Sequence, residues 1–331
     1  MNKKCIGCGS LLQSIDKNKT GYIITEKLND AKYCERCFKI THYNEKLIVP
    51  LKGINNHIIN EINKDNKYVF FLIDFLNINT ETINTFKSIK NNKTLVISKL
   101  DIIPKSIKQP LIINWLKEEY GIEDNIIFIS SKKNLNTGSI SNVLERNNQK
   151  QGYILGFTNA GKSTLINKLC IENNITNNII TTSMIPNTTL DFIKIKLNDN
   201  LTIIDSPGFT FETTIYNDNE FELIERINPK SFLKPITYQT KEITSIIIED
   251  KIRITPGNKN SLTFYMSNQI ILNKVFNNNK KLKRATEKIY EINDNSDIVI
   301  KGIGFINIKK SCELKINSEY QNLIEIRKSM F

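Results

Sequence analysis

The sequence predicts an α/β protein built on a doubly wound, mostly parallel sheet, with a small cysteine-rich element before it and a mainly β (α+β) domain after it. Three observations predict this. Apolar runs typical of strands buried on both faces alternate with helical patterns in residues 47–216. A glycine-rich loop lies between one such strand and a helix. Closely spaced cysteines occur in residues 1–46, and alternating apolar positions occur in residues 217–331. We therefore expect three domains with these bounds.

The composition is that of a soluble globular protein with a strong positive charge. Of 331 residues, 40% are hydrophobic and 24% charged, and the net charge is +12. Heavy use of Asn, Ile and Lys suits an AT-rich genome, but a chain this basic still favours a polyanionic partner such as nucleic acid. The sequence has neither an apolar run of roughly 20 residues, as a membrane span needs, nor a signal or transit peptide. We expect a cytoplasmic protein without a membrane partner.

Two pairs of cysteines predict a structural zinc site near the N-terminus. Two residues separate the members of each pair, and 25 residues, 9–33, lie between the pairs. In a reducing compartment such pairs bind metal more often than they form disulfides, and four thiolates fill the tetrahedral coordination of Zn²⁺. The expected ligands are Cys5, Cys8, Cys34 and Cys37. Unrelated cysteines, or disulfides in a secreted protein, are the alternative. The isolated Cys170 and Cys312 are expected to be buried apolar residues.

The middle range begins with an amphipathic helix or linker at residues 47–66 and continues with buried strands. The strands are expected at residues 68–74, 94–97 and 126–129. The helix between the last two carries an apolar face made by Ile112, Trp115, Leu116 and Tyr120. Ligands of parallel sheets bind at the carboxyl ends of the strands. The residues that follow these strands are therefore candidates for a binding site.

Residues 98–101, which we call the guanine motif, resemble the [NT]-K-x-D specificity motif of GTPases. The Asp101 carboxylate can accept hydrogen bonds from N1–H and the exocyclic amine of guanine, and adenine offers neither donor. The Lys99 stem is expected to pack along the base. Ser98 stands where the motif usually has Asn and makes fewer contacts, which weakens the expected affinity. The residues after the next strand resemble the S-A-K loop, which presents a backbone N–H to the guanine oxygen; they are Ser130, Ser131 and Lys132.

Residues 156–163, which we call the phosphate loop, fit the pattern G-x-x-x-x-G-K-[ST] between an apolar run and a helical pattern. Gly156 and Gly161 allow a tight turn with inward N–H groups, and the helix N-terminus adds free donors. Lys162 is expected to reach the outer phosphates, and the Ser163 hydroxyl to ligate Mg²⁺. A glycine turn without a ligand is the alternative. The expected nucleotide contacts are Gly156, Thr158, Asn159, Ala160, Gly161, Lys162, Ser163 and Thr164.

Two further motifs follow the phosphate loop. Residues 186–191 resemble the P-G-T-T sequence of switch I, and Thr189 is the candidate magnesium ligand that orders this loop when a γ-phosphate is present. A hairpin is expected next, with strands at residues 193–197 and 201–204. It leads into a D-x-x-G motif, in which Asp205 holds magnesium through water and the Gly208 N–H senses the γ-phosphate.

The order of these motifs is unusual. In an ordinary GTPase the phosphate loop comes first and the guanine motif last, whereas here Asp101 and Ser130 precede Gly156. Joining the usual termini and opening a new break leaves the sheet unchanged, because termini of compact domains often lie close together. The sequence therefore predicts a circularly permuted P-loop GTPase domain. The segment after Asp205 then runs directly into the C-terminal domain and can transmit loss of the γ-phosphate.

Residues 217–331 predict strands at 243–254, 262–266 and 298–308, around one helix near residues 280–289. The basic side chains of that helix either form a solvated face or contact RNA phosphates. They are Lys280, Lys281, Lys283 and Arg284. Gly302 and Gly304 are expected in a bulge or turn.

The paired cysteine motifs, the sequence CFKITHYN at residues 37–44, the permuted motif order and the sequence DIVIKGIGF at residues 297–305 together resemble the YqeH family. This resemblance implies a GTPase that acts in maturation of the small ribosomal subunit, with ribosomal RNA as a partner and a C-terminal domain similar to the RNA-binding TRAP fold. It implies GTP or GDP, Mg²⁺ and structural Zn²⁺ as ligands. We expect a monomer.

The resemblance also implies catalytic roles. Phe209 follows Gly208 where many GTPases have the Gln that positions the attacking water, so slow intrinsic turnover is expected. In similar proteins an Asn at the Asn159 position helps to hold a K⁺ ion that stabilises the transition state. The catalytic residues expected on this basis are Asn159, Lys162, Thr189 and Gly208.

Two other functions remain alternatives at this point. Ser98 and Phe209 give some weight to a non-catalytic RNA-binding assembly factor whose affinity is tuned by guanine nucleotide. A P-loop ATPase or small-molecule kinase is the other, and Asp101 disfavours it because adenine lacks the donors that this carboxylate accepts.

Overall fold

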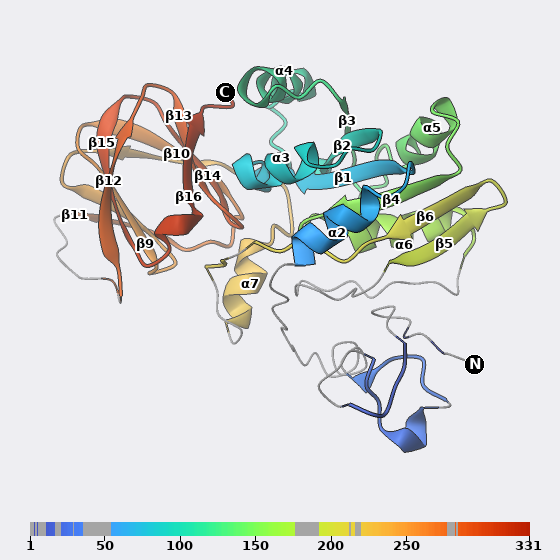
Figure 1. Cartoon of the computed structure of the whole chain (residues 1–331). Helices are drawn as coiled ribbons and strands as arrows, with labels where there is room; N and C mark the ends of the chain where they lie inside the picture. The colour runs from blue at the N-terminus through green and yellow to red at the C-terminus, as the bar shows by residue number, and fades with distance from the viewer. Residues whose placement is uncertain are drawn as a thin grey trace. The chain divides into compact units, whose positions relative to one another are not determined.

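A computed structural model gives the structure of the chain for residues 3, 5, 11–16, 21–28, 30–35, 54–175, 192–211, 213–215, 220–276, 282 and 284–331 (Figure 1). The chain divides into two compact units. Unit 1 comprises Met1–Phe75, Glu81–Leu100 and Asp124–Thr210, and unit 2 comprises Leu76–Thr80, Asp101–Glu123 and Phe211–Phe331. The chain thus passes from one unit to the other inside the guanine motif, after Leu100. The three domain bounds drawn from the sequence remain a prediction.

Unit 1 contains a six-stranded sheet in the order β3-β2-β1-β4-β6-β5. Its strands are β1 (Tyr68–Asp74), β2 (Lys93–Ser98), β3 (Asn125–Phe128), β4 (Gln151–Gly156), β5 (Ile193–Asn198) and β6 (Leu201–Asp205). All neighbours are parallel except the β5–β6 hairpin. The predicted mostly parallel sheet is therefore confirmed, and β1 is buried along its whole length because it lies at the centre.

Helices cover both faces of this sheet, as a doubly wound fold requires. They are α2 (Ile54–Ile62), α3 (Thr80–Lys87), α5 (Ser139–Arg146) and α6 (Lys162–Glu172). Phe70 and Leu72 of β1 share one core with apolar side chains of α5 and α6. Phe71 points to the opposite face and packs on Phe86 of α3, with ring centroids 5.8 Å apart. The alternation of side chains along a strand produces these two cores.

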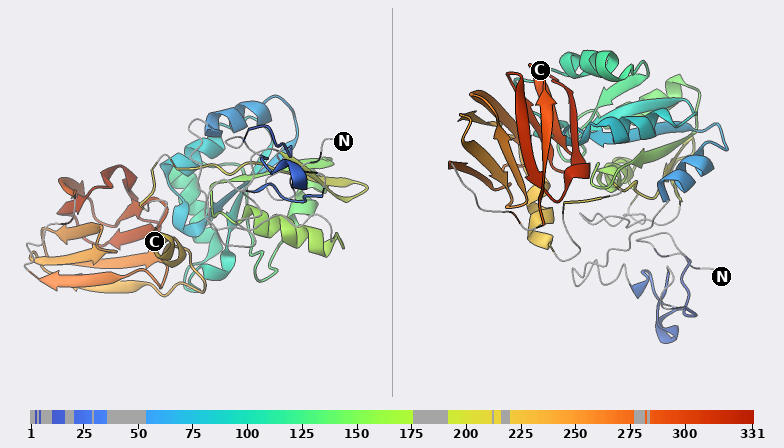
Figure 2. Two further views of the ribbon diagram at one scale, coloured as in Figure 1. Left: turned by 90° about the horizontal axis from the view of Figure 1, so that it is seen from below. Right: turned by 60° about the vertical axis from the view of Figure 1, so that its left-hand side comes forward.

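Unit 2 contains two five-stranded antiparallel sheets that enclose a common core (Figure 2). The first has the order β16-β13-β14-β10-β7 and the second β11-β8-β9-β15-β12. Their bounds are β7 (Ile236–Thr240), β8 (Thr244–Ile248), β9 (Ile252–Pro256), β10 (Asn260–Met266), β11 (Leu272–Phe276), β12 (Thr286–Ile292), β13 (Ser296–Ile300), β14 (Gly304–Ile308), β15 (Cys312–Ser318) and β16 (Ile324–Lys328). Unit 2 also holds α4 (Gln109–Tyr120) and α7 (Phe221–Ile227).

Short 3₁₀ turns occur in both units. They are η1 (Thr25–Lys27), η2 (Phe75–Asn77), η3 (Leu100–Ile102) and η4 (Gln321–Leu323).

The helix predicted near residues 280–289 is wrong for the part that the structure describes. Residues 286–292 form β12, which pairs with β15 at seven successive positions. Lys280, Lys281 and Lys283 lie outside the described residues, and Arg284 has a φ of 52°. The basic run suggested a helix, but the β-branched and aromatic side chains of Thr286, Ile289 and Tyr290 suit a strand.

Two of the predicted strands are hairpins. Residues 243–254 contain β8 and the first part of β9, and the chain turns between them at Glu249 and Asp250, with φ values of 50° and 52°. Positive φ at both central residues is the geometry of a type I′ turn. Residues 298–308 contain parts of β13 and β14, and Gly302 lies in the turn with a φ of 82°. The predicted turn at Gly302 is confirmed. In the described parts of the chain, every helix is too short or too polar to span a bilayer.

Candidate active site

The phosphate loop connects β4 to α6 as predicted. Gly156 has a φ of 154°, and a Cβ atom there would lie 2.5 Å from the Leu72 carbonyl oxygen of β1. Asn159 and Gly161 have φ values of 64° and 90° before α6 begins at Lys162. Such left-handed turns direct successive N–H groups inward, and the start of α6 adds its own free donors. The backbone therefore has the form of an anion-binding cradle.

Lys162 lies against the D-x-x-G motif. Its Nζ atom donates to the Gly156 carbonyl over 3.4 Å. A Cβ atom at Gly208 would lie 3.1 Å from the same nitrogen. Burial lowers the pKa of Lys162, and the negative charge of Asp205 raises it in part. The structure thus brings Lys162 together with Gly156, Gly208 and Asp205, and it places a basic side chain where polyphosphate would bind.

The remaining residues of the phosphate loop differ in exposure. Thr158 donates its hydroxyl to the Phe209 carbonyl over 2.9 Å, so this side chain serves the loop's own structure. Ala160 is buried, Ser163 is half-buried in the first turn of α6, and Thr164 is exposed. Ser163 is therefore placed at the helix N-terminus, where a hydroxyl can reach a metal ion beside the phosphates.

Phe209 is fixed inside the core. Its ring is fully buried, and its centroid lies 5.6 Å from those of Phe71 and Phe157. Its N–H donates to the Gly156 carbonyl over 3.1 Å, and its carbonyl accepts the Thr158 N–H over 2.8 Å. The Phe209 backbone therefore joins the D-x-x-G segment to the phosphate loop, and its side chain, which stands where many GTPases have Gln, is buried away from solvent.

The start of the guanine motif contacts the phosphate loop directly. The Ser98 hydroxyl donates to the Ala160 carbonyl over 2.6 Å, and both residues are buried. The Leu100 N–H donates to the Ile129 carbonyl over 2.9 Å, which joins the motif to the segment before Ser130. Ser98, which stands where the motif usually has Asn, therefore links the guanine motif to Ala160 of the phosphate loop, 62 positions later in the chain.

Lys99 has a partner that the sequence analysis missed. It adopts a φ of 55°, and its Nζ atom lies 3.3 Å from the Asp74 carboxylate at the end of β1. A left-handed non-glycine residue is strained, and such strain is common at functional sites. The signal for Asp74 was available, because a carboxylate that ends a buried parallel strand lies at the ligand-binding edge of the sheet.

Asp101 lies in η3, three residues after Ser98, and is half-buried. Three extended residues span at most about 10 Å, so covalent connection alone keeps Asp101 within that distance of Ser98. Ser130 is buried and accepts the Lys133 N–H on its hydroxyl over 3.1 Å. Ser131 is half-buried and Lys132 is exposed.

Thr189 and the cysteines Cys8 and Cys37 lie outside the described residues. The other two predicted zinc ligands, Cys5 and Cys34, are each 1% exposed, and the Cys34 N–H donates to the Cys5 sulfur over 3.1 Å. Within the described residues, no group of three or more His, Cys, Asp or Glu side chains could hold a metal. Cys170 is buried as expected, whereas Cys312 is only half-buried.

Comparisons with known proteins agree with this geometry. The family model described as "50S ribosome-binding GTPase" matches residues 151–321, and the model described as "RsgA GTPase" matches residues 62–213. The chain is 30% identical over 298 residues to the "Uncharacterized protein YqeH" of Bacillus subtilis, which covers 87% of this chain and 80% of that protein.

More distant matches cover less. The "GTPase Era" of Borrelia garinii is 32% identical over 53% of this chain and 58% of that protein. The crystal structure of YjeQ from Thermotoga maritima is 18% identical over 44% of this chain and 49% of that chain, with a TM-score of 0.32. The first covers about half of this chain, and the second is too distant to carry an argument.

Proposed function

The chain belongs to the YqeH family of circularly permuted GTPases, and on that premise we propose that it is a GTP-driven switch that assists maturation of the small ribosomal subunit. Hydrolysis of GTP, with GTP, GDP and Mg²⁺ as ligands, follows from the GTPase models that match the chain. Membership of this family favours a hydrolysing enzyme over the non-catalytic alternative. The observation that best supports this switch is the position of the Lys162 Nζ atom, which lies beside Gly208 of the D-x-x-G segment and donates to the Gly156 carbonyl of the phosphate loop.

We propose the following roles for the nucleotide site. The phosphate-loop amides and Lys162 bind the phosphates, and Ser163 and Thr189 ligate Mg²⁺. Asp205 holds Mg²⁺ through water, and the Gly208 N–H senses the γ-phosphate. Loss of that phosphate removes a partner of Gly208, two residues before the chain leaves unit 1 at Thr210. The switch therefore acts on the segment that leads into unit 2.

A ribosomal partner is supported by the net charge of +12 and by the ribosome named in one family description. That description names the 50S subunit, whereas the sequence resemblance implied the small one. We expect the chain to sediment with small subunits in the GTP state and to leave them with GDP. GTP turnover should rise when small subunits are added. Turnover should also be faster in K⁺ than in Na⁺ buffer, because Asn159 is expected to help hold a K⁺ ion. Sedimentation with large subunits only would contradict the small-subunit proposal.

Asp101→Asn is expected to change the base preference of the nucleotide site from guanine to xanthine. An amide offers a donor to the 2-oxo group of xanthine, while guanine loses a charged acceptor, so GTP affinity should fall by about 100-fold or more. Competition with a fluorescent guanine nucleotide measures this. Asp199→Asn is the control, because the Asp199 side chain is 94% exposed in the β5–β6 turn. Unchanged preference for GTP over XTP in Asp101→Asn would remove Asp101 from the guanine site.

We further propose that the cysteine-rich element holds structural Zn²⁺ through Cys5, Cys8, Cys34 and Cys37. The N–H to sulfur hydrogen bond between Cys34 and Cys5 supports this, because backbone donors commonly stabilise a thiolate. The purified chain should contain one zinc ion, and Cys34→Ser should lower the zinc content severalfold, as metal analysis can measure. Cys170→Ser is the control, since Cys170 lies in another core. A zinc-free wild-type protein with intact fold would contradict the proposal.

A further inference from the structure

Two segments that follow the nucleotide motifs belong to unit 2. Leu76–Thr80 begins two residues after Asp74, the partner of Lys99. Asp101–Glu123 begins at Asp101 and contains α4. Both segments follow strands of unit 1 in the chain, and both make hydrogen bonds with residues between Leu233 and Lys328.

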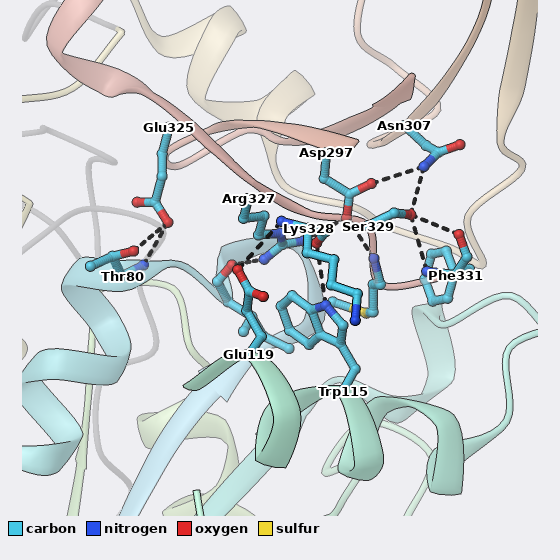
Figure 3. Close-up of polar contacts among 12 residues, drawn as sticks. Thr80, Trp115, Glu119, Asp297, Asn307, Glu325, Arg327, Lys328, Ser329 and Phe331 are labelled. Carbon is cyan, nitrogen blue, oxygen red and sulfur yellow. Dashed lines mark hydrogen bonds and ion pairs between the residues drawn. The ribbon is translucent and has the colours of Figure 1, made fainter. Parts of the chain in front are cut away.

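Arg327 of β16 is the centre of these contacts (Figure 3). Its side chain is 2% exposed, and Nη2 lies 3.3 Å from the buried Asp297 carboxylate. Its Nη1 donates to the Ile78 carbonyl. The guanidinium also lies over the Trp115 ring, 4.6 Å from the centroid. One buried cation therefore contacts both segments at once.

The Asp297 carboxylate is itself held in place. It accepts the Asn307 side-chain N–H and the Met330 backbone N–H, each over 3.1 Å. A buried ion pair of this kind resists displacement of either partner, because separation would leave a charge without compensation. Arg327 is thus held in place by Asp297, and it contacts both segments.

The segment that begins at Asp101 is fixed at two places. The Ile102 carbonyl accepts the Leu233 N–H over 2.9 Å, and Ile102 is 2% exposed. Further on, the Trp115 Nε1–H donates to the Lys328 carbonyl over 3.2 Å, and Trp115 is 5% exposed. Ile102, beside Asp101, and the helix that follows it are therefore both bound to other parts of unit 2.

The other segment is fixed in the same way. The Asn77 side-chain oxygen accepts the Gly302 N–H over 2.9 Å. Glu325 accepts the Thr80 N–H and hydroxyl over 2.9 and 2.6 Å (Figure 3). The charged side chain thus caps the first residue of α3.

From these contacts we propose that Arg327 and Trp115 are positioning residues for guanine recognition. They hold the segment that carries Asp101, and Ser98, three residues earlier, is hydrogen-bonded to the phosphate loop. Any partner that displaces the C-terminal strands then changes base recognition first. This inference rests on the proposed role of Asp101.

The test compares GDP with inosine diphosphate, which lacks the exocyclic amine that Asp101 accepts. Dissociation constants are measured for the wild type, Arg327→Met, Trp115→Phe and the control Asn260→Ala. Asn260 is equally buried and donates to the Lys310 carbonyl over 2.8 Å, but it touches neither segment. We expect both test variants to lose roughly tenfold in preference for GDP, while inorganic tripolyphosphate binds as in the wild type. The control should keep the wild-type preference.

The single tryptophan gives a second readout. GDP should change the emission of Trp115 in the wild type, and tripolyphosphate should not. If Arg327→Met does not fold, as judged by circular dichroism, Trp115→Phe and the wild-type emission decide the matter. An unchanged preference for GDP in the folded variants, or a tripolyphosphate effect equal to that of GDP, would overturn the proposal.

Asp101→Asn is measured alongside, so that two failures can be told apart. If Asp101→Asn exchanges guanine for xanthine while the folded Arg327 and Trp115 variants keep the wild-type preference, only the positioning role falls. If Asp101→Asn keeps its preference for GDP, the guanine role of Asp101 falls, and the positioning role falls with it.

Discussion

Lys162→Ala is expected to lower GTP hydrolysis by about 100-fold or more and to weaken GTP binding, while the fold remains intact. The physical reason is that Lys162 supplies the positive charge beside the phosphate loop, and removing one such preorganised group from a transferring phosphoryl commonly costs this much. Its Nζ atom lies next to Gly208 and Gly156, between the phosphate loop and the D-x-x-G segment. Single-turnover hydrolysis and nucleotide titration measure both effects.

The matched control is Lys168→Ala on the same helix. The Lys168 side chain is 25% exposed and lies 3.8 Å from Glu172, one turn further along α6. Such surface pairs contribute about 0.5 kcal/mol or less, and the control should hydrolyse GTP at the wild-type rate. Wild-type turnover in folded Lys162→Ala would exclude the phosphate loop as the catalytic site.

Gly156→Ala is expected to destabilise the chain by about 3 kcal/mol or more. The added Cβ atom would lie 2.5 Å from the Leu72 carbonyl oxygen, which belongs to the central strand and cannot rotate away. Left-handed strain and steric overlap each cost about 1–3 kcal/mol. The midpoint of urea unfolding, followed by circular dichroism, measures the loss.

Two alanine variants separate the causes of that loss. Gly138→Ala meets no atom within 4 Å and has an ordinary φ of −61°, so it should change stability by less than about 1 kcal/mol. Gly161→Ala also meets open space but has a φ of 90°, so it should show the strain alone. Equal midpoints for Gly156→Ala and Gly161→Ala would show that the contact with Leu72 contributes nothing.

The central sheet was predictable because its signals are local. A strand buried on both faces is apolar throughout, as in β1, and a glycine-rich turn before a helix is encoded within eight residues. The turn at Glu249 and Asp250 was missed because its left-handed residues are not the usual Asn or Gly. The strand β12 was missed because a basic run resembled a helix face, while its pairing with β15 is a long-range contact.

Two residues in the site, Phe209 and Lys99, show the same limit of what the sequence can predict. That Phe209 replaces a polar residue is visible in the sequence, but its burial against Phe71 and Phe157 is not. Likewise, Lys99 belongs to a recognisable motif, whereas its pairing with Asp74 depends on β1 and β2 being neighbours in parallel. Motif identity is local, and the orientation of each side chain depends on the packing around it.

By itself the sequence determined the family, the permuted order of the nucleotide motifs and the mostly parallel sheet, since each follows from residue types at short spacing. Only the tertiary structure decided that Ser98 binds Ala160 and that Arg327 reaches Ile78, 249 positions away. Contacts of that kind arise when strand order brings distant segments together. Because strand order minimises the free energy of the whole chain, no single stretch of residues encodes it.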